Sequence, residues 1–256
     1  MKHPLALLAA LLTAAPAFAQ ITIDQNKALA GNVTPGDGPG FPVTLSQPGS
    51  YKLTGNLSVP ANTKGIVIAA EGVTLDLNGY TIAAPGLCSQ PFNYTAQPVT
   101  CTQPTYGTYH GIEVAVDAPG TVIRNGTVRG FSGTGIQTTE GETIEHMHVA
   151  HNGNGGIGGS TGSMVGTRII DSTVALNYRF GIAESSGIVE RCNVASNGGD
   201  GVNGGGFLIV RNSNVRANYG NSLSGVTVVG TMSANNRYGR LKVTSLGGNI
   251  EQLVVY

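Results

Sequence analysis

The sequence has few charged residues and no excess of either sign. Only 11% of its 256 residues are Asp, Glu, Lys or Arg, and the formal net charge is zero. A protein that binds nucleic acid or an anionic membrane through its charge carries a basic excess. The composition therefore argues against a nucleic-acid partner. An acidic polysaccharide would be attracted only by a local charged patch.

Long apolar runs are missing after the first 19 residues. The segment 1–19 begins with Lys2, continues through the apolar run Leu5 to Ala15 and ends at Ala17-Phe18-Ala19. A short positive start, an apolar stretch and an A-x-A site are typical of a secretory signal peptide. The run is too short to span a membrane. We expect removal of residues 1–19, no membrane insertion, and a periplasmic or extracellular location for residues 20–256.

Cysteine is scarce, with three residues in the chain, and tryptophan is absent. Cys88 and Cys101 lie in one irregular segment, and an oxidising compartment favours their pairing. We therefore expect a disulfide between them. Cys192 is left over, and its position in the repeat described next predicts a buried thiol rather than a reactive one.

Glycine is abundant, with 39 residues. A motif that consists of an apolar residue, two further residues and Asn recurs with a period of about 21 residues. The period predicts stacked supersecondary units rather than one globular core. The copies are Val149 to Asn152, Val174 to Asn177, Val194 to Asn197, Val215 to Asn218 and, more weakly, Met232 to Asn235.

Each unit also contains two further short apolar strands, one of which opens with Gly and an apolar residue, as at Gly135-Ile136 and Gly181-Ile182. Turns rich in Gly, Asn, Ser and Asp separate the strands. No stretch shows helical periodicity over three turns. Three strands in about 21 residues predict an all-β parallel β-solenoid, in which every strand pairs with its equivalent one coil away.

In such a fold, equivalent positions form columns. The column two residues before the repeat valine should face inward, and it comprises Gly126, Met147, Ser172, Cys192, Ser213 and Gly230. The column of repeat asparagines should occupy turns, because Asn tolerates the left-handed backbone conformation and its amide can bond along the stack. We therefore interpret the asparagines as scaffold.

Three segments carry a resemblance to known proteins: Gly49 to Leu57, Gly72 to Ile82 and Ile123 to Phe131. With them the chain resembles the right-handed parallel β-helix, pectin-lyase-like superfamily, and more narrowly a group of small exported bacterial β-helix proteins. The resemblance covers nearly all of residues 20–256. It implies a single-stranded right-handed parallel β-helix and no particular activity.

The organisation that we expect is one domain over residues 20–256. Residues 20–50, which are rich in proline, should cap the N-terminal end of the solenoid, and residues 237–256 should cap the C-terminal end, because open ends expose strand edges. Residues 85–109 interrupt the coils and should form a lateral loop closed by the disulfide.

Catalytic or ligand-binding side chains of such a solenoid should stand in an outward column, because the inward columns pack the core. Three residues before the repeat valine stand His146, Asp171 and Arg191 on successive coils. An imidazole, a carboxylate and a guanidinium about 5 Å apart could perform acid–base catalysis or bind a sugar carboxylate. The alternative is an ordinary ion ladder that stabilises the surface.

Further candidates for contact with a ligand surround this column. His148 points in the same direction as His146, yet no second coil offers matching metal ligands, so we expect neither a metal site nor a cofactor. Tyrosines could stack on sugar rings or could merely pack the loop and the turns. The aromatic candidates are Tyr178, Tyr219 and Tyr238 after the asparagine turns, and Phe92, Tyr94, Tyr106 and Tyr109 in the lateral loop, with His110 adjacent.

The catalytic patterns of β-helix enzymes are missing. The sequence lacks the paired aspartates of galacturonan hydrolases, the calcium-binding aspartate cluster of pectate lyases and the Asp-Pro-His signature of alginate epimerases. Only His110-Gly111 and Arg240-Leu241-Lys242 match parts of the hydrolase motifs. We therefore expect an exported protein that binds polysaccharide. The alternatives are a polysaccharide lyase or glycoside hydrolase acting on an acidic glycan, and a non-catalytic cell-envelope scaffold. The oligomeric state is open.

Overall fold

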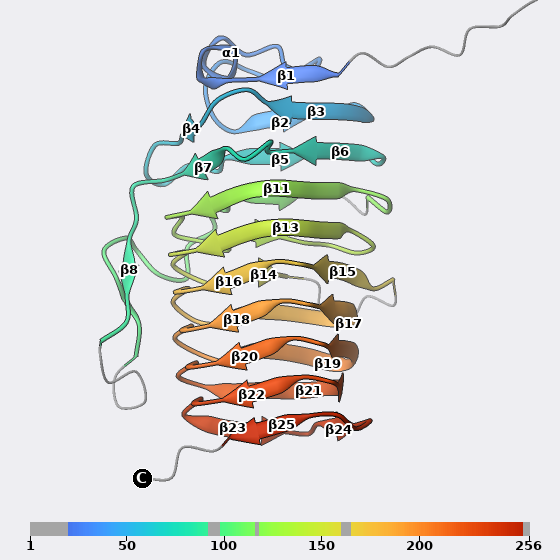
Figure 1. The fold of residues 1–256 in the computed structure, drawn as a ribbon. Coiled ribbons are helices and arrows are strands. Elements are labelled where there is room, and N and C mark those ends of the chain that lie inside the picture. The colour runs from blue at the N-terminus through green and yellow to red at the C-terminus, as the bar shows by residue number, and fades with distance from the viewer. Residues whose placement is uncertain (1–19, 92–97, 116–117, 160–164, 253–256) are drawn as a thin grey trace, which may run out of the picture.

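The chain forms a column of flat coils stacked along one axis (Figure 1). The computed structural model describes residues 20–91, 98–115, 118–159 and 165–252, so the expected signal peptide at 1–19 lies outside the described residues. The fold is an all-β parallel solenoid of about nine turns, with about 21 residues per turn and 3% helix. The expected fold class is confirmed.

Three parallel sheets form the sides of the solenoid. The first face comprises β2 (Val43–Leu45), β5 (Ile66–Ile68), β10 (Ile112–Val114), β12 (Ile136–Gln137), β14 (Ile157–Gly158), the first parts of β17 (Ile182–Glu190), β19 (Val202–Arg211) and β21 (Asn221–Val229), and β23 (Tyr238–Leu241). The second face comprises β1 (Ile21–Ile23), β3 (Gly49–Leu53), β6 (Val73–Asp76), the first parts of β11 (Val122–Arg129) and β13 (Thr143–Ala150), β15 (Thr167–Ile170), the ends of β17, β19 and β21, and β24 (Thr244–Ser245). The third face comprises β4 (Leu57–Ser58), β7 (Thr81–Ala83), the ends of β11 and β13, β16 (Thr173–Ala175), β18 (Asn193–Ala195), β20 (Asn214–Arg216), β22 (Met232–Ala234) and β25 (Ile250–Gln252).

The interior is filled by columns of identical or similar apolar residues. Val128 pairs with Val149, and the column continues through Val174, Val194 and Val215, all of which are fully buried. β-branched side chains fit this pleated, two-sided environment. Burying each valine stabilises the fold by about 1.5–3 kcal/mol relative to exposure, so the stacked columns hold neighbouring coils together.

The weak fifth copy of the repeat was aligned one residue too early. Ser233, not Met232, pairs with Val215 and faces inward, and Met232 is exposed. The inward column that contains Cys192 accordingly ends in the buried Thr231 rather than in Gly230. A polar residue stands in place of the usual valine in this coil, which is why the sequence pattern favoured the wrong register.

The repeat asparagines form a hydrogen-bonded ladder at the corner between the third and first faces, here called the asparagine corner. The side chain of Asn152 donates to Asn177, Asn177 to Asn197, Asn197 to Asn218 and Asn218 to Asn236, at 2.9–3.0 Å. The ladder confirms their scaffold role and includes Asn236, not Asn235. The left-handed conformation belongs instead to the preceding residue, as at Ser196 with φ of 58°.

The two ends of the solenoid differ. Helix α1 (Gln25–Ala30) lies beside β1 at the N-terminal end (Figure 1). The segment 20–50 therefore contains this helix together with β1, β2 and the start of β3, which pair with the coils. At the other end, β23, β24 and β25 add a further coil, and residues 253–256 lie outside the described residues.

The described parts of the segment 85–109 leave the coils and lie beside the asparagine corner (Figure 1). It contains the antiparallel pair β8 (Cys88–Ser89) and β9 (Thr100–Cys101), and the expected disulfide joins Cys88 to Cys101. The side chain of Gln103 donates to the carbonyl of His151 at 2.8 Å, which attaches the loop to the asparagine corner. Within the described residues, no helix is long and apolar enough to cross a membrane.

Cys192 is confirmed as a buried residue of the inward column, with 2% of its surface exposed. Its thiol lies 3.3 Å from the carbonyl oxygen of Glu190 and 3.5 Å from that of Ile169. Burial raises the pKa of the thiol to about 11, so that it stays protonated at neutral pH. A protonated, enclosed thiol is a packing group rather than a nucleophile.

Candidate functional site

The residues His146, Asp171 and Arg191 lie on successive coils, and Asp171 contacts the other two. Arg191 donates two hydrogen bonds to the Asp171 carboxylate, at 2.7 and 2.8 Å, and His146 Nε2 lies 3.8 Å from the same carboxylate. The three residues stand at the corner between the second and third faces, with left-handed φ of 53°, 49° and 51°. Asp171 and Arg191 therefore lie in bends between strands, and His146 lies where β13 changes direction between the two faces.

The electrostatics of this corner favour an ion ladder. The hydrogen bond from Arg191 lowers the pKa of Asp171, and the same contact raises that of Arg191. Glu190 extends the ladder by pairing with Arg191 and Arg211 at 2.7 Å each. A carboxylate held ionised by a bidentate guanidinium is a weak base. The arrangement can anchor a turn, but it is poorly suited to proton abstraction.

A hollow of about 470 Å³ lies beside His146 and Asp171 and is lined also by His148, Thr127 and Thr173. His148 pairs with Thr127 and Thr173 in the third face, as the register predicted. Desolvation by its neighbours and the nearby His151 lower the pKa of His148. Over the described residues, no group of three or more His, Cys, Asp and Glu side chains is arranged to hold a metal ion.

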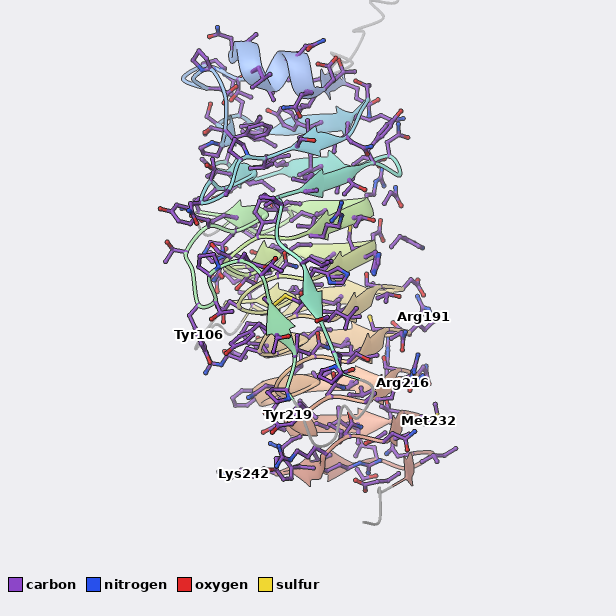
Figure 2. The ribbon with its side chains drawn as sticks, turned by 90° about the vertical axis from the view of Figure 1, so that its left-hand side faces the viewer. Tyr106, Arg191, Arg216, Tyr219, Met232 and Lys242 are labelled. Carbon is purple, nitrogen blue, oxygen red and sulfur yellow. A yellow bond between two sulfur atoms is a disulfide. The ribbon has the colours of Figure 1, made fainter. Side chains whose placement is uncertain are left out.

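Tyr106 and Arg191 lie at opposite edges of the view in Figure 2, so this tyrosine of the lateral loop is far from the charged corner. Tyr106 and Tyr178 meet edge to face, with ring centroids 5.4 Å apart. Arg237 stacks over Tyr219 at 4.3 Å. Phe92 and Tyr94 lie outside the described residues. Tyr178 and Tyr219 are thus committed partly to contacts within the protein.

His110 has a structural role in the first face. Its Nδ1 accepts a hydrogen bond from the backbone N–H of Thr134 at 3.0 Å, and partial burial lowers its pKa. Tyr109 differs from its neighbour: 39% of its surface is exposed, and its side chain borders a cavity at the base of the lateral loop. The two neighbouring candidates therefore have different environments: His110 is bonded within the protein, and Tyr109 is partly exposed beside the cavity.

Sequence reasoning missed a groove of about 590 Å³ on the first face, next to the asparagine corner. The groove crosses four coils, about 14 Å at the spacing of neighbouring strands. Gly158, Ala183 and Gly205 carry no bulky side chain along it, whereas Gln137, Asn154, Arg179, Asp200 and Asn203 supply polar groups and Phe180 an aromatic ring. The signal in the sequence was the run of glycine and alanine at outward positions, which we interpreted only as turns.

The polar groups of the groove are held by neighbouring coils. Asp200 accepts hydrogen bonds from the backbone and side-chain amides of Asn221, at 2.8 and 3.0 Å, and from Asn203 at 3.3 Å. The Asn154 side chain donates to Thr134, but its Oδ1 is buried without a partner among the described residues. A buried acceptor of this kind is normally satisfied by water or ligand. The groove thus offers preorganised polar groups.

A second feature that the sequence did not reveal is a pair of buried glutamates behind the groove. Glu142 is fully buried and accepts hydrogen bonds from the hydroxyls of Thr139 and Thr167 at 2.9 and 3.0 Å. Glu184 is 3% exposed and accepts one from Thr138 at 2.7 Å. Burial, and next the charge of Glu142, raise the pKa of Glu184 to about 8. Glu184 is therefore protonated at neutral pH.

No protein-family model, no curated protein and no solved structure matches this chain. The fold and its grooves are therefore the basis for assigning a function.

Proposed function

We propose that this protein is a carbohydrate-binding solenoid that holds a polysaccharide segment in the first-face groove. The observation that carries the proposal is the groove itself, whose volume of about 590 Å³ falls within the range of small-molecule sites, roughly 300–1,000 Å³. Amide, carboxylate and guanidinium groups beside an aromatic ring are the groups that bind sugar hydroxyls and the apolar faces of sugar rings.

The charge of the groove does not select an acidic chain. Arg179 is balanced by Asp200, and Glu184 is neutral at pH 7 because its pKa is raised to about 8. Recognition would thus depend on hydrogen bonding and ring stacking rather than on long-range attraction. A neutral or weakly charged glycan fits this groove as well as an acidic one.

Filling the groove should abolish binding. We expect Ala183→Trp to weaken the affinity for any bound oligosaccharide by about tenfold or more, because the indole would occupy the space above the β17 strand, and Arg179→Ala to weaken it severalfold. The measurement is isothermal titration with oligosaccharides that are first identified by screening neutral and acidic polysaccharides on an affinity gel.

Two matched variants serve as controls. Thr227→Trp places the same indole on the second face, and Arg168→Ala removes an exposed arginine from β15; neither residue lines the groove. Both should retain the parental affinity. The proposal is wrong if no glycan binds, or if Ala183→Trp binds as tightly as the parent. Concentration-dependent assembly without glycan binding would favour the scaffold alternative.

The same groove supports a second candidate, a glycoside hydrolase. Glu184, protonated at neutral pH, and the Asp200 carboxylate both border it. Glycoside hydrolases commonly use one protonated and one ionised carboxyl group to cleave the glycosidic bond. Incubating polysaccharide with the protein and measuring new reducing ends tests this candidate, which requires that Asp200→Asn abolish any activity. Unsaturated products lost on His146→Ala would instead indicate a lyase at the charged corner.

We further propose that the protein is exported and that it is a right-handed pectin-lyase-like β-helix. The Cys88–Cys101 disulfide supports export, since such bonds persist in oxidising compartments. N-terminal sequencing of protein recovered from the periplasm or medium should begin at Gln20, and an uncleaved Met1 would contradict the proposal. The parallel coils support membership of the superfamily, for which a crystal structure showing the handedness is the test.

A further inference from the structure

We propose that the cavity at the base of the lateral loop is a second binding site, which takes a single neutral sugar. The cavity has a volume of about 280 Å³ and lies between the loop and the turns of the N-terminal coils. Tyr109 and Gln103 border it from the loop, and Phe131 and Ser132 border it from the solenoid. This site does not overlap the groove and does not depend on the function proposed for the groove.

The lining of the cavity sets the chemistry of the ligand. None of the residues that line it is charged, and several are apolar or aromatic, among them Pro85, Pro104, Tyr109 and Phe131. An ionic ligand would lose its hydration in this cavity without gaining a counter-charge. A pyranose combines an apolar ring face with hydroxyl groups around its rim, so it matches a pocket that has one exposed tyrosine ring and a few polar atoms.

Gln103 supplies an acceptor that has no donor. Its Nε2 donates to the carbonyl oxygens of His151 at 2.8 Å and Phe131 at 3.4 Å. These two acceptors fix the orientation of the amide, because the oxygen could not replace the nitrogen there. Oε1 is consequently buried without a hydrogen-bond partner among the described residues.

Ser132 supplies a second unsatisfied group. Its residue is 6% exposed, and its Oγ is also buried without a partner in the described part of the chain. Buried polar atoms in native proteins are normally paired, and two residues that line this cavity each carry one such atom without a partner among the described residues. Sugar hydroxyls both donate and accept, so a bound sugar can pair with both atoms once the two side chains turn toward the cavity.

The size of the cavity favours one sugar ring over a chain. Its volume of about 280 Å³ is less than half that of the groove, at about 590 Å³. It also lies near the lower end of small-molecule pockets. A monosaccharide or the terminal residue of a glycan would fit this volume, whereas a longer segment would exceed it.

The absence of tryptophan from the sequence allows a direct test. Tyr109→Trp keeps an aromatic ring at the cavity and creates a single indole fluorophore. We expect its emission to shift saturably on titration with at least one of D-glucose, D-galactose, D-mannose and N-acetylglucosamine, but not with D-glucuronate. Tyr106→Trp, which places the indole on the same loop outside the cavity lining, should show no shift with any of them.

Variants of the natural chain complete the test by saturation-transfer NMR with the sugar so identified. Tyr109→Ala should lower the affinity about tenfold and Ser132→Ala about threefold, the latter by removing one hydrogen bond. Ser89→Ala on β8, which does not line the cavity, should bind as the parent does, and circular dichroism should show that all four chains are folded. The proposal is overturned if no neutral sugar binds, if D-glucuronate binds more tightly, or if Tyr109→Ala and Ser132→Ala retain full affinity.

Discussion

Replacing Asn197 by alanine is expected to lower the free energy of unfolding by about 3–5 kcal/mol. Asn197 is fully buried in the middle of the asparagine ladder. Its Oδ1 accepts hydrogen bonds from the backbone and side-chain nitrogens of Asn177 at 3.1 and 3.0 Å, and its Nδ2 donates to Asn218 and to the carbonyl of Val174 at 2.9 and 3.2 Å.

The cost arises on both neighbouring coils. Alanine would leave the backbone N–H of Asn177 and one of its two side-chain N–H groups without an acceptor, and would remove a donor from the carbonyl of Val174, in a place that water does not reach. Each buried polar group left unpaired costs about 1–3 kcal/mol. Urea unfolding monitored by circular dichroism provides the measurement.

A matched control lies four residues earlier on the same coil. Asn193 is on β18 in the outward column between Thr173 and Asn214, and Asn193→Ala should cost less than about 1 kcal/mol, as outward substitutions usually do. Equal losses in the two variants would show that the ladder adds no more stability than a surface amide.

The second large effect concerns pH. We expect the protein to become less stable as pH rises from about 4.5 towards 8, and we expect Glu184→Gln to remove much of this dependence. The pKa of Glu184 is raised from 4.5 to about 8 by burial and by the charge of Glu142. The folded state therefore keeps a proton that the unfolded state releases in this interval.

The direction follows from proton linkage. Where the folded state binds more protons than the unfolded state, stability falls with pH, by about 1.4 kcal/mol per pH unit for one group. The stabilising contribution is complete below pH 4.5 and is lost as pH passes through 8. Glutamine can still accept the hydrogen bond from Thr138, so the variant should match the parent near pH 5 and exceed it by several kcal/mol at pH 8.5.

Urea unfolding at pH 5, 7 and 8.5 provides this comparison. Glu71 is an exposed residue between strands, and Glu71→Gln is the matched control that should follow the parent at each pH. If Glu184→Gln and the parent lose stability in parallel, the buried carboxyl of Glu184 is not the titrating group.

Much of the architecture could be predicted from the sequence because a solenoid repeats its own environment. Equivalent positions of successive coils have the same neighbours. Val149, Val174 and Val194 therefore identify the same inward column independently. The register that placed His146, Asp171 and Arg191 on adjacent coils followed from that repetition. The register was wrong only in the coil where Ser233 replaces the valine, because a single irregular copy lacks the valine that marks the inward position in the other coils.

The candidate sites were harder to predict for a physical reason. A groove depends on the side chains that are missing at outward positions, and Gly158 or Gly205 looks the same in a sequence whether it opens a groove or makes a turn. The cavity at Tyr109 depends on how the lateral loop returns to the coils, and contacts such as that between Gln103 and His151 have no periodicity to reveal them. The chemistry at Glu184 arises from burial, which its position in a strand did not disclose.

The bonds between the asparagine side chains have one direction, because Asn152, Asn177, Asn197 and Asn218 each donate to the asparagine of the next coil towards the C-terminus. Each rung is therefore interchangeable with the next. A duplicated coil could be inserted between two asparagines without breaking the chain of amide bonds, and an insertion between Asn152 and Asn197 would lengthen the neighbouring groove by about 4.8 Å. The asparagines that stabilise the fold are thus compatible with a binding surface whose length changes by one coil at a time.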